Sequence, residues 1–234
     1  MADPTFRDPL EGVRATARTI LTEPEAKRLL AALGISVPRG GVARTAEEAE
    51  AVARELGVVA LKVVAPGVTH KSRLGWVACP IPPGCVRECF RYLMDRAVQA
   101  GSPVQGVLVE QYLPGDVECI VGYARLPRFG PVIMFGLGGL TVEARGEVRF
   151  RLAPLGPAEA DTLVSEVGDG SRGWVRALSP KGRDALIHTL VTVGGIAADP
   201  RLSAIREVDI NPLAVSRDGC AALDALVILE PPEA

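Results

Sequence analysis

His70, one of two histidines in the 234-residue chain, is either a reactive group in a phosphate-handling loop or a polar residue in an ordinary turn. It lies in the stretch VTHKSRLGWV (68–77), directly before Lys71. Near neutral pH an imidazole offers an unprotonated nitrogen that can attack phosphorus, and phosphohistidine is a good phosphoryl donor. Taken alone, the stretch favours an ordinary polar residue in a turn. The second histidine, His188, matches no motif, and we expect it to be structural or exposed.

Three charged residues lie in or beside predicted strands. Lys62 is central in the apolar run VVALKVV (58–64). Lysine is seldom buried without a partner, so Lys62 either points into a cleft, where it could bind nucleotide phosphates, or keeps its ammonium in water at a strand edge. Glu110 and Glu118 are predicted on adjoining strands across the turn 114–116. They could bind ribose hydroxyls or an amino group, although the residues alone favour two solvent-facing glutamates.

Two further motifs could bind ions. The run FGLGG (135–139) follows an apolar strand, and its glycines would let backbone N–H groups approach an anion, or simply form a bend. In EVDINPL, Asp209 and Asn211 share a strand face because strands have period two. With Asp224 on the neighbouring strand they supply oxygen ligands of the kind Mg²⁺ prefers. Alternatively, the short polar side chains serve the turn before Pro212.

Alternating helix and strand patterns must position these residues. The segments with helical periodicity and end signals are 22–34, 45–57, 85–100, 157–167 and 181–193. The segments typical of strands are 58–64, 76–81, 106–113, 117–124, 131–139, 147–155, 205–215 and 220–229. Early alternation followed by antiparallel pairs predicts an α+β (mixed α/β) protein with two lobes.

The predicted organisation has an extension and two lobes. We assign 1–19 to an N-terminal extension, 39–111 to an N-terminal lobe, and 20–38 with 112–234 to a C-terminal lobe that includes a leading helix. The turn 114–116 is the expected hinge.

Composition limits the possible functions. A net charge of −2 and 4% aromatic residues argue against nucleic-acid binding. No apolar run approaches the length of a membrane span, and the charged N-terminal residues do not read as a secretory signal, so we expect a cytoplasmic protein. The five cysteines form no CxxC pair and are expected to be structural.

Taken together, these motifs resemble a known family over about residues 20–230. The resemblance is to the ATP-grasp β subunit, or the fused C-terminal half, of the NDP-forming acyl-CoA synthetases, which include ADP-forming acetyl-CoA synthetase. The stretches that carry it are EAKRLLAALGISVPRG, LKVVAPGVTHKSRLGWV, GVLVEQYLPGDVECIVG, FGPVIMFGLGG, FRLAPL, SRG and EVDINPLAV. It implies an ATP-grasp fold in which two α+β lobes hold nucleotide in a cleft between them.

The resemblance also implies a role for each candidate residue. The residues that it places at nucleotide or phosphate are Lys62, Glu110 (adenine), Glu118 (ribose), Gly138, Gly139, Arg151 and Arg172. It makes Asn211 and Asp224 ligands of Mg²⁺, supported by Asp209. His70 matches the family histidine that relays a phosphoryl group.

The implied activity is a reversible phosphoryl relay with ADP or ATP as substrate. Acyl-CoA and phosphate form an acyl phosphate on a CoA-binding α subunit, and a histidine there takes the phosphoryl group. His70 then passes it to ADP. The family suggests an α2β2 hetero-oligomer, in which this chain is inactive without its partner.

Two departures from the family pattern keep other functions open. The family usually reads HKSDVGGV, whereas this chain has Arg73 in place of an acid and Trp76 in place of a glycine. Trp76 could block nucleotide entry, or pack against the base or the partner. A degenerate ATP-grasp module that binds without catalysis is therefore one alternative. A stand-alone ATP-grasp ligase that joins a carboxylate to an amine is another.

Overall fold

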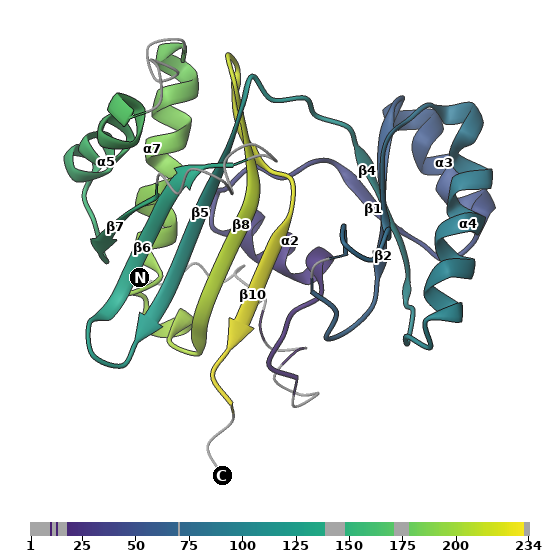
Figure 1. Cartoon of the computed structure of the whole chain (residues 1–234), viewed down its shortest axis with the longest axis horizontal. Helices are drawn as coiled ribbons and strands as arrows, with labels where there is room; N and C mark the ends of the chain where they lie inside the picture. Colours follow the sequence, from purple (N-terminus) through teal and green to yellow (C-terminus); the bar gives the residue numbers. More distant parts are fainter. Residues whose placement is uncertain are drawn as a thin grey trace. The chain divides into compact units, whose positions relative to one another are not determined.

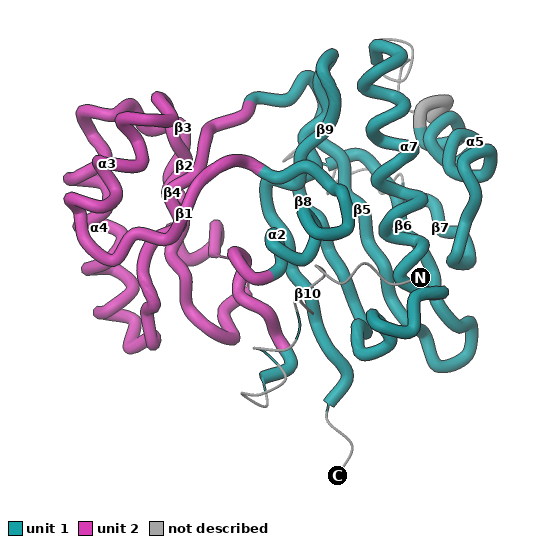
Figure 2. Tube along the Cα trace, turned by 180° about the vertical axis from the view of Figure 1, so that it is seen from behind, with its two compact units in different colours: residues 1–19, 26–37, 114–234 teal, residues 20–25, 38–113 magenta. Residues whose placement is uncertain are grey.

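The computed structural model describes residues 10, 13, 18–69, 71–138, 148–170 and 178–231. The chain forms two compact units, coloured separately in Figure 2. Unit 1 consists of residues 1–19, 26–37 and 114–234, and unit 2 of residues 20–25 and 38–113. None of the described helices combines the length and the apolar character needed to cross a membrane.

Unit 2 contains a four-stranded sheet in which all neighbours are antiparallel, in the order β1-β4-β2-β3. Its strands are β1 (Gly40–Ala43), β2 (Val59–Val64), β3 (Val77–Ile81) and β4 (Gly106–Gln111). The helices α3 (Ala46–Leu56) and α4 (Val86–Gln99) pack on the sheet and on each other, and the short 3-10 turn η1 (Pro83–Cys85) precedes α4 (Figure 1). Thr45 caps α3, because its Oγ1 accepts the Glu48 N–H at 3.2 Å.

Strand alternation separates the apolar core of unit 2 from its charged residues. Val59, Leu61 and Val63 of β2 belong to the core cluster that packs against α3 and α4. Lys62 lies between Leu61 and Val63, so its side chain leaves the opposite face of the sheet. The strand that buries this core therefore also places the predicted phosphate-binding lysine.

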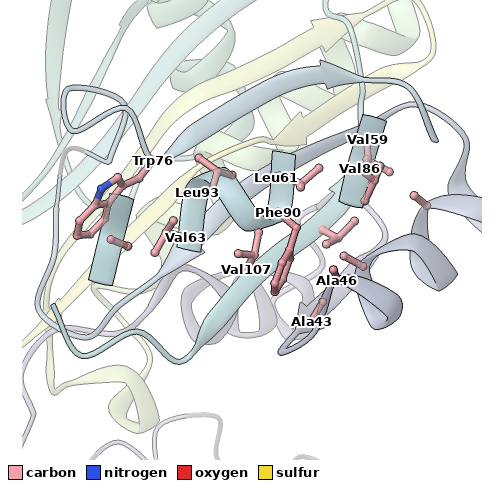
Figure 3. Close-up of a cluster of buried hydrophobic side chains, with 14 of the residues drawn as sticks. Ala43, Ala46, Val59, Leu61, Val63, Trp76, Val86, Phe90, Leu93 and Val107 are labelled. Atoms are coloured by element: carbon pink, nitrogen blue, oxygen red, sulfur yellow. The ribbon is translucent and has the colours of Figure 1, made fainter. Parts of the chain in front are cut away.

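Trp76 belongs to the same core. Its side chain is 3% exposed and packs in the cluster that contains Val63 and Leu93, as Figure 3 shows. The backbone carbonyl of Trp76 accepts the Val63 N–H at 3.0 Å, which ties the residue to β2. The tryptophan that replaces a family glycine thus fills the interior of unit 2.

Unit 1 contains a larger antiparallel sheet in the order β10-β8-β5-β6-β7, with β9 also paired to β8. Its strands are β5 (Val117–Leu126), β6 (Gly130–Leu137), β7 (Val148–Leu152), β8 (Ile205–Ser216), β9 (Gly219–Ala222) and β10 (Ala225–Leu229). The predicted pairing across the turn 114–116 is wrong, since β4 and β5 belong to different sheets.

The end of the chain differs from the single strand predicted over 220–229. It forms two strands, β9 and β10, which pair with successive stretches of β8. The register is the same in both, since Leu213 lies opposite Ala222 and Ile210 lies opposite Ala225. The interruption lies opposite Pro212, which has no N–H to donate to the ladder. The Leu223 N–H still donates to the Pro212 carbonyl at 2.9 Å.

Helices cover one face of the unit 1 sheet. The helices α5 (Pro157–Gly170) and α7 (Pro180–Gly195) pack against the strands and each other, and the 3-10 turn η2 (Pro200–Leu202) follows (Figure 1). Helix α2 (Glu23–Ala32) begins with residues of unit 2 and continues with residues of unit 1. Gly34, just after α2, takes a positive φ of 86°, a conformation that favours glycine.

Candidate functional site

The predicted phosphate-binding lysine of unit 2 is held by two carboxylates. Lys62 Nζ lies 2.9 Å from Glu23 Oε1 and 2.8 Å from Glu110 Oε1. Glu110 belongs to β4, the strand next to β2, and Glu23 begins α2. All three side chains are buried, and buried charges are tolerated when they are paired and hydrogen-bonded. Lys62 is therefore a buried lysine with partners, not an edge residue in water.

A second lysine joins this group. Lys71 Nζ donates to Glu23 Oε2, so the Glu23 carboxylate is shared between Lys62 and Lys71. The side chain of Lys71 is nearly buried as well. Two lysines and two glutamates therefore form a compact charge-balanced group, which we call the Glu23 cluster: Glu23, Lys62, Lys71 and Glu110. A phosphate that binds Lys62 must compete with two carboxylates.

The predicted metal ligands of unit 1 gather on one face of the sheet. Asp209 and Asn211 alternate with Ile210 in β8, and Ile210 is buried. Because Ala225 pairs with Ile210, the preceding Asp224 lies opposite Asn211 at the interruption between β9 and β10. Strand alternation then puts all three polar side chains on the same face.

This oxygen-rich set fits a hard cation. Carboxylate and amide oxygens are the ligands that Mg²⁺ uses, commonly with only one or two carboxylates completed by substrate phosphates and water. Asn211 is exposed, whereas Asp209 and Asp224 are half-buried. Within the described part of the chain, no group of three or more His, Cys, Asp or Glu side chains is gathered for metal binding. The fit therefore depends on the amide of Asn211 and on substrate oxygens.

A buried lysine supports the interruption that carries Asp224. Lys27, on α2, donates from Nζ to the Leu223 carbonyl at 2.6 Å. Its side chain is buried, and Ala222 donates its N–H to the Ser36 carbonyl at 2.9 Å nearby in the same unit. These contacts fix the backbone directly before Asp224.

Glu118 and Gly138 are brought together by their backbones. The Gly138 N–H donates to the Glu118 carbonyl at 2.7 Å, which continues the pairing of β5 with β6. A Cβ atom at Gly138 would lie 3.3 Å from the backbone of Cys119, so glycine permits this close approach. The Gly138 N–H predicted to face an anion is engaged in the sheet. The Glu118 side chain is exposed.

Arg151 lies on the other face of the sheet from the acidic group. Its strand partner is Ile133, which is buried under α7, and its Nη2 forms an ion pair with Glu166 Oε1 of α5 at 2.5 Å. Asp209, which pairs with Gly122, lies on the opposite face of the sheet from Arg151. The structure therefore does not bring Arg151 beside the predicted metal ligands.

Three predicted site residues lie outside the described residues. They are His70, Gly139 and Arg172. Glu110 and Glu118, predicted on adjoining strands, belong to the separate sheets of unit 2 and unit 1. Glu23, Lys27 and Lys71 were missed, because the sequence marks them only as a first-turn acid and two lysines. The available clue was Lys62, because a lysine inside an apolar strand needs partners for its buried charge.

Comparisons with known proteins agree on one family. Residues 12–229 match the family model of the ATP-grasp domain. The "Acetate--CoA ligase [ADP-forming] I subunit beta" of Pyrococcus furiosus is 39% identical over 232 residues, which cover 95% of this chain and 97% of that protein.

Solved structures agree as well. The "dinucleotide forming Acetyl-coenzyme A synthetase 1" of Ca. Korarchaeum cryptofilum, in complex with coenzyme A, Ca-AMPCP and HgCl+, matches with a TM-score of 0.86 and 35% identity, covering 96% of this chain and 99% of that chain. Another structure of that synthetase holds coenzyme A and Mg-AMPPCP, with its phosphohistidine segment pointing towards the nucleotide binding site. It matches with a TM-score of 0.78 and 34% identity over 96% of this chain and 99% of that chain.

Proposed function

Because the chain belongs to the ATP-grasp domain family, we propose that it is the β subunit of an ADP-forming acyl-CoA synthetase. The observation that carries the proposal is the 39% identity to an acetate–CoA ligase β subunit along nearly the whole of both chains. The reaction converts acyl-CoA, ADP and phosphate reversibly to a carboxylate, CoA and ATP, in the cytoplasm. The partner is a CoA-binding α subunit, in an α2β2 assembly.

His70 is the catalytic residue of this proposal. Its imidazole nitrogen accepts the phosphoryl group from the partner's phosphohistidine, forming one phosphorus–nitrogen bond as the other breaks. A terminal phosphate oxygen of ADP then attacks the phosphorus, and the bond to His70 breaks to give ATP. Histidine suits both steps because its free pKa near neutrality leaves one nitrogen unprotonated.

The remaining residues bind and orient the nucleotide. Lys62 binds its phosphates, Glu110 lies near adenine and Glu118 near the ribose. Gly138 and Gly139 form the turn at the phosphates, which Arg172 approaches, whereas Arg151 stays paired with Glu166 on the helix-covered face. The burial of Lys62 supports its role, since a desolvated ammonium interacts strongly with an anion that replaces its carboxylate partners.

Asp209, Asn211 and Asp224 hold Mg²⁺ in this proposal. Their common sheet face and their oxygen donors support that assignment. A bound Mg²⁺ would neutralise the charge that spreads over the phosphate oxygens during transfer.

Phosphoryl labelling tests the proposal. The chain is incubated with ATP carrying a labelled γ-phosphate and with Mg²⁺, and we expect an acid-labile, base-stable label. His70→Ala abolishes the label, whereas the control His188→Ala, at an exposed position of α7, retains it. Nucleotide binding without any label identifies the non-catalytic module instead. Full synthetase activity of His70→Ala with the partner present excludes the relay and favours the stand-alone ligase.

A further inference from the structure

The segment that directly follows His70 in the chain is a closed turn of unit 2. The N–H groups of Leu74 and Trp76 both donate to the Lys71 carbonyl, at 3.1 and 3.0 Å, and the Gly75 N–H donates to the Ser72 carbonyl at 3.1 Å. Gly75 has a positive φ of 69°, which suits the tight return of the chain. We call this segment, residues 71–76, the 71–76 turn.

Two anchors hold the far end of the 71–76 turn. Trp76 is buried in the apolar core of unit 2. The Leu74 carbonyl accepts a hydrogen bond from Arg96 Nη2 of α4 at 3.1 Å, and Arg96 also donates from Nη1 to the Tyr92 hydroxyl at 3.0 Å. Both anchors lie three to five residues beyond Lys71 and reach it only through hydrogen bonds to its backbone carbonyl, so neither fixes its side chain.

The anchor at the near end is Glu23. One carboxylate oxygen accepts from Lys71, while the other accepts from Lys62 at 2.9 Å. Lys62 is fixed in turn by the sheet and by Glu110. Glu23 is therefore restrained on one side and can restrain Lys71 on the other. Its own side chain is only 3% exposed, and buried charge-assisted hydrogen bonds are the strong ones.

We propose that Glu23 is a positioning residue for the phosphoryl-carrying segment. Resting on the proposed function, the inference is that the Glu23 carboxylate fixes Lys71 and so sets where the chain enters the 71–76 turn after His70. Glu23 acts through Lys71 and does not contact the transferred group. A phosphoryl carrier must present its nitrogen in a defined place, because small displacements of reacting groups slow the reaction strongly.

Hydrogen exchange tests the anchor without any need for activity. In Lys71→Gln, which leaves the Glu23–Lys62 pair in place, we expect the amides of Leu74, Gly75 and Trp76 to exchange roughly tenfold faster or more, the factor that loss of one charged hydrogen bond predicts. Glu23→Gln should do the same. Lys71→Arg, which keeps the cation, should restore slow exchange. The exposed control Arg91→Gln on α4 should change nothing in the turn.

Labelling of His70 supplies the second measurement, with partner subunit, ATP and Mg²⁺. We expect Lys71→Gln and Glu23→Gln to slow labelling roughly tenfold, the double variant to be no slower than the slower single one, and Lys71→Arg to recover most of the rate. Unchanged exchange in both single variants overturns the inference. So does faster exchange with labelling at the wild-type rate. If the wild-type chain itself takes no label, the proposed function has failed, while exchange still decides whether Glu23 fixes the turn.

Discussion

Lys62 Nζ lies 2.8 Å from Glu110 Oε1, and the two side chains are only 8% and 3% exposed. Removing one partner of a buried ion pair leaves an uncompensated charge, so Lys62→Met should lower the free energy of unfolding by about 3–5 kcal/mol. Adding Glu110→Gln removes that stranded charge and should recover much of the loss. Urea denaturation followed by circular dichroism measures both variants.

The same pair separates stability from binding. Nucleotide affinity, measured by calorimetry on the folded double variant, should remain low even where stability recovers, because the ammonium that binds phosphate and the carboxylate near adenine are both gone. Wild-type affinity in Lys62→Met/Glu110→Gln would contradict the role of Lys62.

The sheet face that carries Asp209, Asn211 and Asp224 should set the requirement for Mg²⁺. Asp224→Asn should raise the Mg²⁺ concentration for half-maximal labelling of His70 by about tenfold or more, as loss of a ligand or its support does in metal sites. The control is Asp218→Asn, an exposed carboxylate in the turn between β8 and β9. An equal shift in both variants would show a general charge effect in place of a ligand.

Trp76 should matter for stability and not for nucleotide entry. Its side chain is 3% exposed within the unit 2 core, so Trp76→Ala should cost about 3–5 kcal/mol of unfolding free energy, and Trp76→Phe considerably less. The folded Trp76→Phe variant should bind ADP with wild-type affinity in calorimetry. Tighter binding on shortening this side chain would instead mean that Trp76 obstructs nucleotide.

The stability that the contact between α5 and α7 contributes should depend on pH. A hydrogen bond from Arg183, 2.7 Å from Asp161 Oδ1, holds the pKa of the Asp161 carboxyl below its usual 3.8. A depressed folded pKa means that the pair stabilises the fold above the unfolded pKa, and that this stability is lost as pH falls through the folded value. The Asp161 side chain is 47% exposed, so the contribution at pH 7 is at most about 1 kcal/mol.

Denaturation of Asp161→Asn checks this sign. The variant should be less stable than wild type at pH 7, and the difference should close in acid once Asp161 is protonated in the folded state. Asp184→Asn, at an exposed position of α7, is the matched control and should show no such closing difference. A gap that persists in acid would mean that the substitution acts on packing.

Local sequence rules predicted elements better than partnerships. The ATP-grasp fold was implied by the family resemblance, and the family match over 12–229 and the TM-score of 0.86 confirm it. The cap at Thr45 and the strand around Lys62 follow from neighbouring residues alone. The partners of Lys62 do not, because Glu23 is 39 positions away and only the fold brings it there.

The site was predicted unevenly for the same reason. Asp209 and Asn211 share a face because strand alternation is local, whereas the place of Asp224 depends on an interruption set by Pro212 on another strand. Arg151 was predicted from its motif, but the face on which it lies follows from pairing with β6 and from α5. The roles of all these residues in nucleotide and metal binding stay predictions.

The burial of Trp76 also gives the protein an internal optical probe. The chain has two tryptophans, and replacing Trp174 with phenylalanine would leave Trp76 as the single indole emitter. An indole in an apolar core emits at shorter wavelength than one in water, so its emission would move to the red when the unit 2 core opens. Since Trp76 closes the 71–76 turn, this shift in emission would report in real time whether the turn beside His70 is closed.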